Sequence, residues 1–286
     1  MLRRPAPGTF DELAAQGESL DVALGVALLA RDVYGDLAPE ALLARFDDLA
    51  QPLVGKQLGQ RPLHEQADAL GAHLYVHLGF AGNEDDYYDP KNSLLPDVLE
   101  RRRGIPISLA LVYCEVARRV GVRARGVGFP GHFLVRLDCG PDRDGQEAPI
   151  FIDPFFGGRV LDEAALGALL GRVAGQAQAA ALMRPDMLVP IAPRPMLLRW
   201  LHNLRSVYLA RNELSRALLV VDRIAALSPG EAGPLRDRGL LAAKLGATTA
   251  AKEDLERVVL LDPEGEHGRE ARAALVRLGE PKGQPN

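Results

Sequence analysis

The sequence predicts an α+β fold: a helical part, then a small antiparallel sheet, then an all-α segment. Two changes of pattern predict this order. Apolar residues recur at helical spacing as far as "RRRGIPISLALVYCEVARR" at 101–119, and the period then becomes two. After a proline-rich stretch the pattern is helical again and repeats itself. A chain of 286 residues is long enough to hold two such parts.

The first eighty residues are predicted to form four helices. Thr9 and Glu12 have the spacing of a capping box, which marks the start of the first helix. A long apolar stripe over 20–34 predicts the second helix. Pro39 suits the first position of the third helix, and an amphipathic pattern predicts the fourth over about 61–78.

A polar loop over 82–92 leads to a short helix, for which Asn92 or Ser93 can act as the N-cap. The next helix begins with Pro106, where the missing amide hydrogen breaks no hydrogen bond. The first two turns of this helix are apolar nearly all round, which indicates a helix buried at the centre of a domain.

Three strands and a helix are predicted next. Alternating patterns place the strands at 124–129, 132–139 and 149–155. The last two strands are joined by the turn-rich loop 140–148, and a helix is expected over about 161–173. We therefore expect the first domain to cover residues 1–183.

The last third of the chain contains an internal repeat. "AALSPGE" at 225–231 recurs as "LLDPEGE" at 260–266, and their prolines lie 34 positions apart. This is the period of tetratricopeptide repeats, in which each repeat is a helical hairpin. The sequence therefore predicts two such repeats over 196–279, a stiff proline-rich linker over 184–195 and a disordered tail over 280–286.

Two repeats rarely bury enough apolar surface by themselves. We therefore expect them to pack on the first domain, with Trp200 and Leu201 near the junction.

Composition excludes several classes of protein. A net charge of −4 gives no overall attraction to nucleic acids or acidic membranes. No apolar run is long enough to span a bilayer, and the N-terminus lacks the core of a signal peptide. Cys114 and Cys139 are too few for a disulfide framework and lie in no zinc-binding pattern, so a cytoplasmic protein without metal or cofactor is expected.

A His/Asp pair is predicted at one end of the sheet. His132 begins one strand and Asp153 ends the next, and these two ends lie together in an antiparallel hairpin. A carboxylate there can orient the imidazole, as the third member of a nucleophilic triad does. The thiolate of such a triad would lie at the start of the buried helix, and Pro106 occupies that position.

The stretches "ARRVGVRARGV", "GHFLVRL" and "FIDPFFGG" resemble the transglutaminase-like (papain-like) core fold. That family has a Cys at the start of a helix, a His on a strand and an Asp on a strand, and these positions correspond to Pro106, His132 and Asp153. More closely, "NSLLPDVLERRRGIPISLALVY", "GVGFPGHFLVR" and "IDPFFGG", with terminal tetratricopeptide repeats, resemble the SirB family of bacterial proteins. The resemblance covers nearly the whole chain.

The other candidate nucleophiles are Ser108, Cys114 and Cys139. Ser108 can serve as a nucleophile or, by the simpler interpretation, stabilise the first helical turn. Cys114 is expected in the core, and Cys139 lies far along the hairpin from His132. The His132 side chain can instead form hydrogen bonds with backbone carbonyl groups.

Two further groups have a functional and a simpler interpretation. His73 and His77 have a metal-compatible spacing without a third ligand, so ordinary helix surface is favoured. The basic run 101–103 can contact phosphate or an acidic partner, but a solvated face is favoured.

The sequence thus predicts a pseudoenzyme, a non-catalytic transglutaminase-like protein that binds a protein or peptide or has a regulatory role. The alternative is a hydrolase or acyltransferase that uses Ser108 or a water activated by His132. No nucleic acid or membrane partner is expected. The residues expected to contact a partner are Arg103, Phe129, Phe155, Trp200 and Tyr208.

Overall fold

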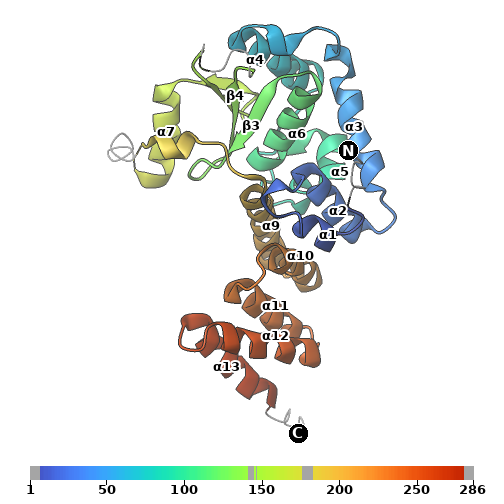
Figure 1. Cartoon of the computed structure of the whole chain (residues 1–286), viewed down its shortest axis with the longest axis vertical. Helices are drawn as coiled ribbons and strands as arrows, with labels where there is room; N and C mark the ends of the chain where they lie inside the picture. Colours follow the sequence, from blue (N-terminus) through green and yellow to red (C-terminus); the bar gives the residue numbers. More distant parts are fainter. Residues whose placement is uncertain (1–6, 141–144, 146, 176–182, 280–286) are drawn as a thin grey trace. The chain divides into compact units, whose positions relative to one another are not determined.

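The computed structural model of the protein describes residues 7–140, 145, 147–175 and 183–279 (Figure 1). Contacts divide the chain into two units. The sheet unit is Asp21–Trp200, and the repeat unit combines Met1–Leu20 with Leu201–Asn286. The predicted α+β order is confirmed, since the strands lie in the sheet unit and the chain ends in consecutive helices.

The sheet has one strand more than the sequence predicted. Its order is β3 to β6, and every neighbouring pair is antiparallel. The fourth strand has only three residues, too few to show an alternating pattern. Most of the predicted loop 140–148 lies outside the described residues. The strands are β3 (Arg123–Val127), β4 (Leu134–Asp138), β5 (Ile150–Asp153) and β6 (Arg159–Leu161).

Helix α6 (Pro106–Arg119) packs against β3 and β4 (Figure 1). Its residues 106–113 are all buried, as the unbroken apolar pattern predicts. Pro106 occupies one of the first two helical positions. A short parallel pair was not predicted: β1 (Ala81–Gly82) pairs with β2 (Arg103–Gly104), and β2 directly precedes this helix.

The local signals at the helix ends are confirmed in most cases. Thr9 and Glu12 form the predicted capping box, and Pro39 begins its helix. The fourth helix changes at Ala72 into a π-helical turn, Ala72–His77. The helices of this part are α1 (Phe10–Ala14), α2 (Val22–Tyr34), α3 (Pro39–Ala50), α4 (Leu63–Gly71) and α5 (Leu95–Arg101), with 3₁₀ turns at Gly17–Ser19, Gln51–Leu53, Leu58–Gln60 and Pro90–Asn92.

Asn92 and Ser93 do not cap α5, which is a correction to the sequence analysis. The N-cap position belongs to Leu94, which makes no side-chain hydrogen bond there. The Asn92 side chain is fully buried and is used inside the preceding loop, where it accepts from Asn83 and donates to the carbonyl of Asp86. A polar loop that packs against the core needs such an internal partner.

The stretch predicted to be a stiff proline-rich linker is hydrogen-bonded to the sheet. It contains a 3₁₀ turn, Pro185–Leu188, after which Pro190 forms a bridge with Val127 of β3. The amide of Ile191 donates to the carbonyl of Gly126 at 2.9 Å. The stretch therefore extends the hydrogen bonding of the sheet, and helix α9 (Pro193–Ala210) begins within it.

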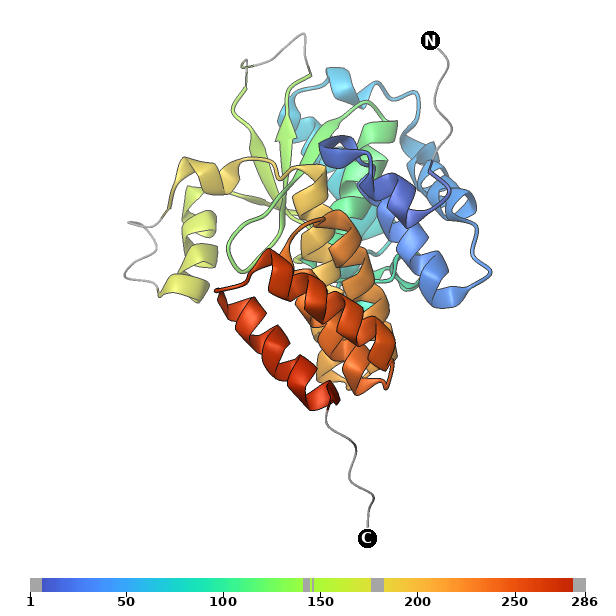
Figure 2. The ribbon, with the colours of Figure 1, turned by 60° about the horizontal axis from the view of Figure 1, so that its bottom comes forward.

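Helix α9 crosses the boundary between the units, since residues 193–200 belong to the sheet unit and the following turns to the repeat unit. In the repeat unit, consecutive helices pack against one another (Figure 2). Helix α1 packs against α10, so residues 7–20 group with the repeats and not with the rest of the predicted domain 1–183. The other helices are α7 (Glu163–Ala174) of the sheet unit and α10 (Leu214–Leu227), α11 (Ala232–Lys244), α12 (Thr248–Leu261) and α13 (Glu266–Gly279) of the repeat unit.

Among the described residues, no helix combines the length and the apolar character needed to cross a bilayer. The predicted tail 280–286 lies outside the described residues.

Candidate functional site

His132 and Asp153 are joined by a hydrogen bond at the end of the sheet. His132 lies two residues before β4, and Asp153 is the last residue of β5. The distance from Nε2 of His132 to Oδ1 of Asp153 is 2.9 Å. The antiparallel hairpin predicts this contact, and an ionised carboxylate requires Nε2 to carry the hydrogen.

Asp153 has further partners on both carboxylate oxygens. The amides of Phe155 and Phe156 donate to Oδ1 at 3.1 and 3.2 Å, and Nη2 of Arg159 donates to Oδ2 at 3.1 Å. Burial acts to raise the pKa of Asp153, but the hydrogen bonds from His132 and the two amides lower that pKa below its ordinary value. The carboxylate is therefore ionised and held in one orientation.

Two aromatic rings enclose the His132 imidazole. Phe155 meets it edge-on, with ring centres 6.4 Å apart, and Phe156 stacks on it at 6.2 Å. The side chain of His132 is only 11% exposed. Among the described residues, none bonds to Nδ1, so one ring nitrogen is held by Asp153 and the other remains available.

Contacts through Phe155 connect this pair to the start of α6. The Phe155 ring covers Gly82 so closely that a Cβ there would come within 2.6 Å of it. Gly82 pairs with Gly104 in the β1–β2 ladder, and Gly104 lies against the Ser108 hydroxyl. Glycine is required at both positions because any side chain would displace these neighbours.

No thiol lies at the start of α6. Pro106 stands there, while Cys114 lies eight positions further along the helix. Burial raises the pKa of the Cys114 thiol well above its ordinary value, so this thiol is protonated at neutral pH. Cys139 follows β4 and is 4% exposed, with Sγ 3.9 Å from Oε1 of Glu147.

Ser108 serves the structure of the helix start. Its hydroxyl accepts from the amide of Ile105 at 3.0 Å and lies 2.8 Å from the carbonyl of Asn92, to which it donates. The side chain is fully buried. This geometry supports the simpler interpretation and argues against Ser108 as a nucleophile, because its hydrogen is already used by a carbonyl.

Three of the residues expected to contact a partner have no exposed surface. Phe129, Trp200 and Tyr208 are each 0% exposed, so they are core residues, and the expectation that they bind a partner is corrected. The sequence pattern could not separate a buried aromatic residue from an exposed one. Phe155 is 7% exposed and belongs to the His132 enclosure. Arg103 is exposed, and its Nη1 donates to the carbonyl of Gly79 at 2.9 Å.

Two arginines that were not predicted from the sequence hold the site. Arg159, which binds Asp153, directly follows the "FFGG" motif. Nη2 of Arg199, on α9, donates to the carbonyl of Phe129 at 3.2 Å and to the carbonyl of His132. The position of Arg159 beside the motif was a usable signal, whereas nothing in the sequence indicated Arg199.

Tyr75 was also missed. It lies in the π-helical turn, and its ring covers Gly158, whose φ is +68°. Burial and the nearby Asp153 carboxylate raise the pKa of Tyr75, so its hydroxyl stays protonated. Single-turn π-helical segments are frequent at functional sites.

The spacing of His73 and His77 does not produce a metal site. Nε2 of His73 lies 2.7 Å from the carbonyl of Leu49, and His77 is exposed. Across the described residues, no group of three His, Cys, Asp or Glu side chains has an arrangement that could hold a metal ion.

Comparisons with known proteins identify the two kinds of domain in the chain. The transglutaminase-like superfamily matches residues 40–202, and the tetratricopeptide repeat matches residues 204–276. A UPF0162 protein of Xylella fastidiosa (strain 9a5c) is 40% identical over 267 residues, which cover 91% of each chain. A UPF0162 protein of Pseudomonas aeruginosa is 33% identical over 262 residues, 90% of each chain.

A shorter match extends to eukaryotes. Human F-box only protein 21 is 44% identical over 98 residues, which cover 33% of this chain and 15% of that protein. The long matches decide the assignment. The chain belongs to the transglutaminase-like superfamily and, within it, to the UPF0162 proteins of bacteria.

Proposed function

We propose that the protein is a non-catalytic member of its superfamily that acts in the cytoplasm by binding a protein or peptide. The two kinds of domain in the chain support a role in protein interaction. Both cysteines are free thiols, which suits a reducing compartment.

The observation that carries this proposal is Pro106 at the start of α6. A transglutaminase-like reaction begins with attack by a thiolate, and the resemblance assigns that thiolate to this position. A proline ring has no nucleophile, and neither cysteine nor Ser108 replaces it. Without a nucleophile no acyl-enzyme forms, so the His132–Asp153 pair acts as a fixed polar support for the surrounding loop.

A second candidate is a hydrolase in which His132 activates water. The observation that favours it is that Asp153 holds Nε2 while Nδ1 is available. A histidine oriented in this way can act as a general base.

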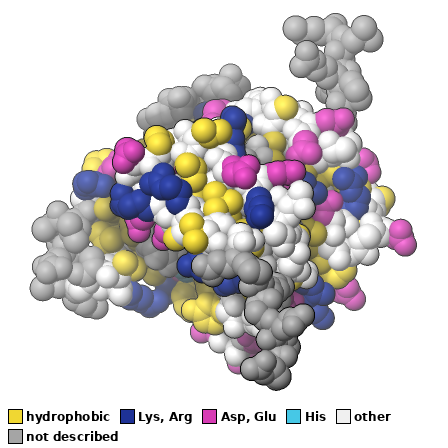
Figure 3. All heavy atoms as spheres, turned by 90° about the horizontal axis from the view of Figure 1, so that it is seen from below, with side chains coloured by type: hydrophobic (Ala, Val, Ile, Leu, Met, Phe, Trp, Pro, Cys, Tyr) yellow, Lys and Arg dark blue, Asp and Glu magenta, His cyan; other side chains and the backbone are white. Residues whose placement is uncertain are grey.

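The net charge and the mixed charges on one face support a protein partner rather than a nucleic acid. On the face drawn in Figure 3, acidic and basic side chains both lie among hydrophobic ones. Binding to a nucleic acid backbone requires basic side chains clustered on one face. The net charge of −4 points the same way.

The experiment that decides between the two candidates is hydrolysis of 4-nitrophenyl acetate by the purified full-length protein. Exposed imidazoles hydrolyse this ester slowly by themselves, so His77→Ala is the matched control for His132→Ala. We expect His132→Ala to change the rate of ester hydrolysis by no more than His77→Ala changes it.

A rate in His132→Ala at least tenfold below that of wild type, with His77→Ala unchanged, would contradict the proposal and establish the hydrolase. Treatment of the wild type with iodoacetamide adds a second measurement. We expect it to leave the rate unchanged, because neither thiol takes part.

A further inference from the structure

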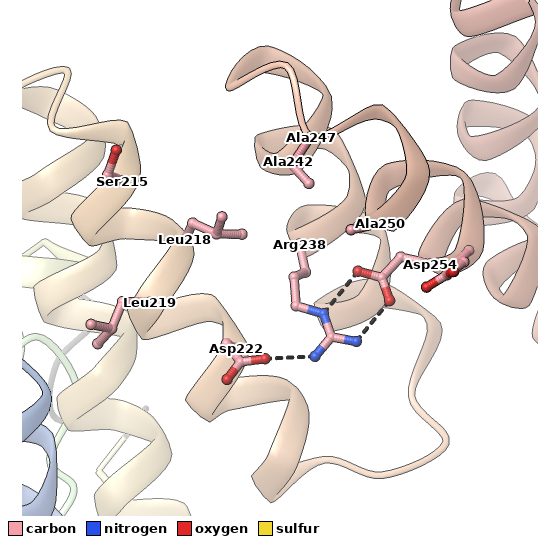
Figure 4. A pocket seen from close by; sticks show the side chains of 10 residues that line it. Ser215, Leu218, Leu219, Asp222, Arg238, Ala242, Ala247, Ala250 and Asp254 are labelled. Carbon is pink, nitrogen blue, oxygen red and sulfur yellow. Dashed lines mark hydrogen bonds and ion pairs between the residues drawn. The ribbon is translucent and has the colours of Figure 1, made fainter.

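The repeat unit contains a groove that is separate from the His132 site. It has a volume of about 480 Å³ and is formed by α10, α11 and the first turns of α12 (Figure 4). One end of it is apolar and the other is charged.

At the apolar end, a large side chain on one wall of the groove faces small side chains on the other wall. Leu218 of α10 points into the gap, and the opposite wall is formed by Ala242, Ala247 and Ala250 (Figure 4). An alanine side chain stops at Cβ, so the space opposite Leu218 remains unfilled. An apolar side chain of leucine size can enter this space and remove apolar surface from water.

The charged end has an excess of carboxylates. Asp222 and Asp254 lie there with one basic residue, Arg238, and Glu253 is a third acidic residue in the lining of the groove (Figure 4). Glu253 is exposed and makes no ion pair with any described residue. This end therefore carries a net negative charge at neutral pH.

Arg238 is already committed to its neighbours. Its Nε and Nη2 donate to the two oxygens of Asp254 at 2.8 and 2.7 Å, and its Nη1 donates to Asp222 at 2.7 Å (Figure 4). These bonds, led by the one to Asp254, raise the pKa of Arg238 above its ordinary value. The guanidinium joins three helices and is not directed at an incoming anion, so an acidic segment or a free C-terminal carboxylate finds no free cationic group among the lining residues.

We propose that this groove binds a protein segment in which a lysine or arginine lies about 6 Å from an apolar side chain of leucine size. The spacing follows from the walls of the groove, since Leu218 and Asp222 are one helical turn apart on α10. The inference rests on the proposed role of the repeats in protein binding and names the chemistry of the partner.

The probe is a fluorescein-labelled peptide of leucine, alanine and lysine residues with both ends blocked. Its counterpart has glutamate in place of every lysine. Binding to the full-length protein is measured by fluorescence anisotropy. We expect the lysine peptide to bind at least tenfold more tightly than the glutamate peptide, and its affinity to fall as the salt concentration rises.

Two substitutions locate the binding in the groove. Glu253→Gln removes an exposed charge and should lower the affinity for the lysine peptide by up to about fivefold. Ala250→Lys fills the apolar end and adds a repelling charge, and it should weaken binding at least tenfold. The matched controls Glu256→Gln and Thr249→Lys change exposed residues of the same helix outside the groove, and should stay within twofold of wild type.

Equal binding of the two peptides, or equal effects of groove and control substitutions, would overturn the inference. His132→Ala separates it from the proposed function, because this variant should bind the lysine peptide as wild type does. Ester hydrolysis that depends on His132 would contradict the proposed function and leave the groove proposal intact. Absence of peptide binding would contradict the groove proposal and leave the result of the ester assay unchanged.

Discussion

At the scale of single residues, Asp153 is the group on which the His132 site depends. Its carboxylate accepts hydrogen bonds from two side chains and two backbone amides, and it is fully buried. An asparagine has the same shape but offers one oxygen instead of two and carries no charge.

Asp153→Asn should therefore lower the free energy of unfolding by about 2–4 kcal/mol, because it leaves a buried imidazole and a half-exposed guanidinium without their anion. Urea unfolding at pH 7 measures this. Asp186→Asn is the matched control, since Asp186 forms an exposed ion pair with Arg184 and should change stability by less than about 0.5 kcal/mol. Equal losses in both variants would show that the four contacts of Asp153 add nothing.

The carboxylate of Asp153 should also make the stability of the protein depend on pH. The pKa of Asp153 in the folded protein lies below the ordinary value of 3.8, so its contribution to stability is complete above that value. The contribution is lost as the pH falls through the lower pKa of the folded state. The difference in unfolding free energy between wild type and Asp153→Asn should thus be constant from pH 7 to about 5 and shrink below about pH 4. A difference that persists unchanged to pH 2 would contradict this.

At the scale of elements, the β1–β2 pair fixes where Phe155 lies. Gly82→Ala would place a Cβ 2.6 Å from the Phe155 ring, and the ring would have to move. We expect a loss of about 1–3 kcal/mol in stability, together with a shifted His132 ring resonance in NMR spectra, because Phe155 packs on that ring. Gly140→Ala is the control, since an added Cβ there meets no atom within 4 Å. If the His132 resonance did not shift in Gly82→Ala, the β1–β2 pair would not influence the surroundings of the His132 ring.

Elements with local signals were predictable from the sequence, and elements defined by distant contacts were not. The capping box at Thr9 and the proline starts of α3 and α6 depend on neighbouring residues alone. The β1–β2 pair joins two-residue strands more than twenty positions apart, so it leaves no periodic pattern.

The candidate site divides in the same way. The hairpin pattern was sufficient to bring His132 to Asp153, because a hairpin fixes which strand ends meet. Arg199 reaches the site from a helix 67 positions further along the chain, and Trp200 donates to the carbonyl of Ser93, which lies 107 positions earlier. No spacing rule in the sequence connects such pairs.

At the scale of the whole molecule, the repeat unit takes its first helix from the other end of the chain. Phe10 of α1 is 2% exposed, and the guanidinium of Arg223 on α10 lies 5.4 Å from the centre of its ring. Helix α1 has only five residues and is too short to be stable without such packing.

Phe10→Ala should therefore destabilise the repeats by about 3–5 kcal/mol. Hydrogen exchange should become faster in α10 while β3 and β4 keep their protection. Phe46→Ala provides the opposite control, because Phe46 is fully buried in α3 of the sheet unit. Faster exchange in β3 and β4 than in α10 after Phe10→Ala would contradict this assignment of α1.

Helix α9 determines where this chain can be recombined with a relative. Nη2 of Arg199 holds two carbonyls of the loop that carries His132, and Nε1 of Trp200 donates to the carbonyl of Ser93 at 2.9 Å. A crossover at residue 184 or 196, where composition alone would place it, keeps His132 and Asp153 but exchanges the residues that shape their surroundings. In a chimera with the crossover after residue 202, where the superfamily match ends, the His132 site keeps Arg199 and Trp200 of its own chain. The first turns of α9 are thus inherited with the sheet and not with the repeats.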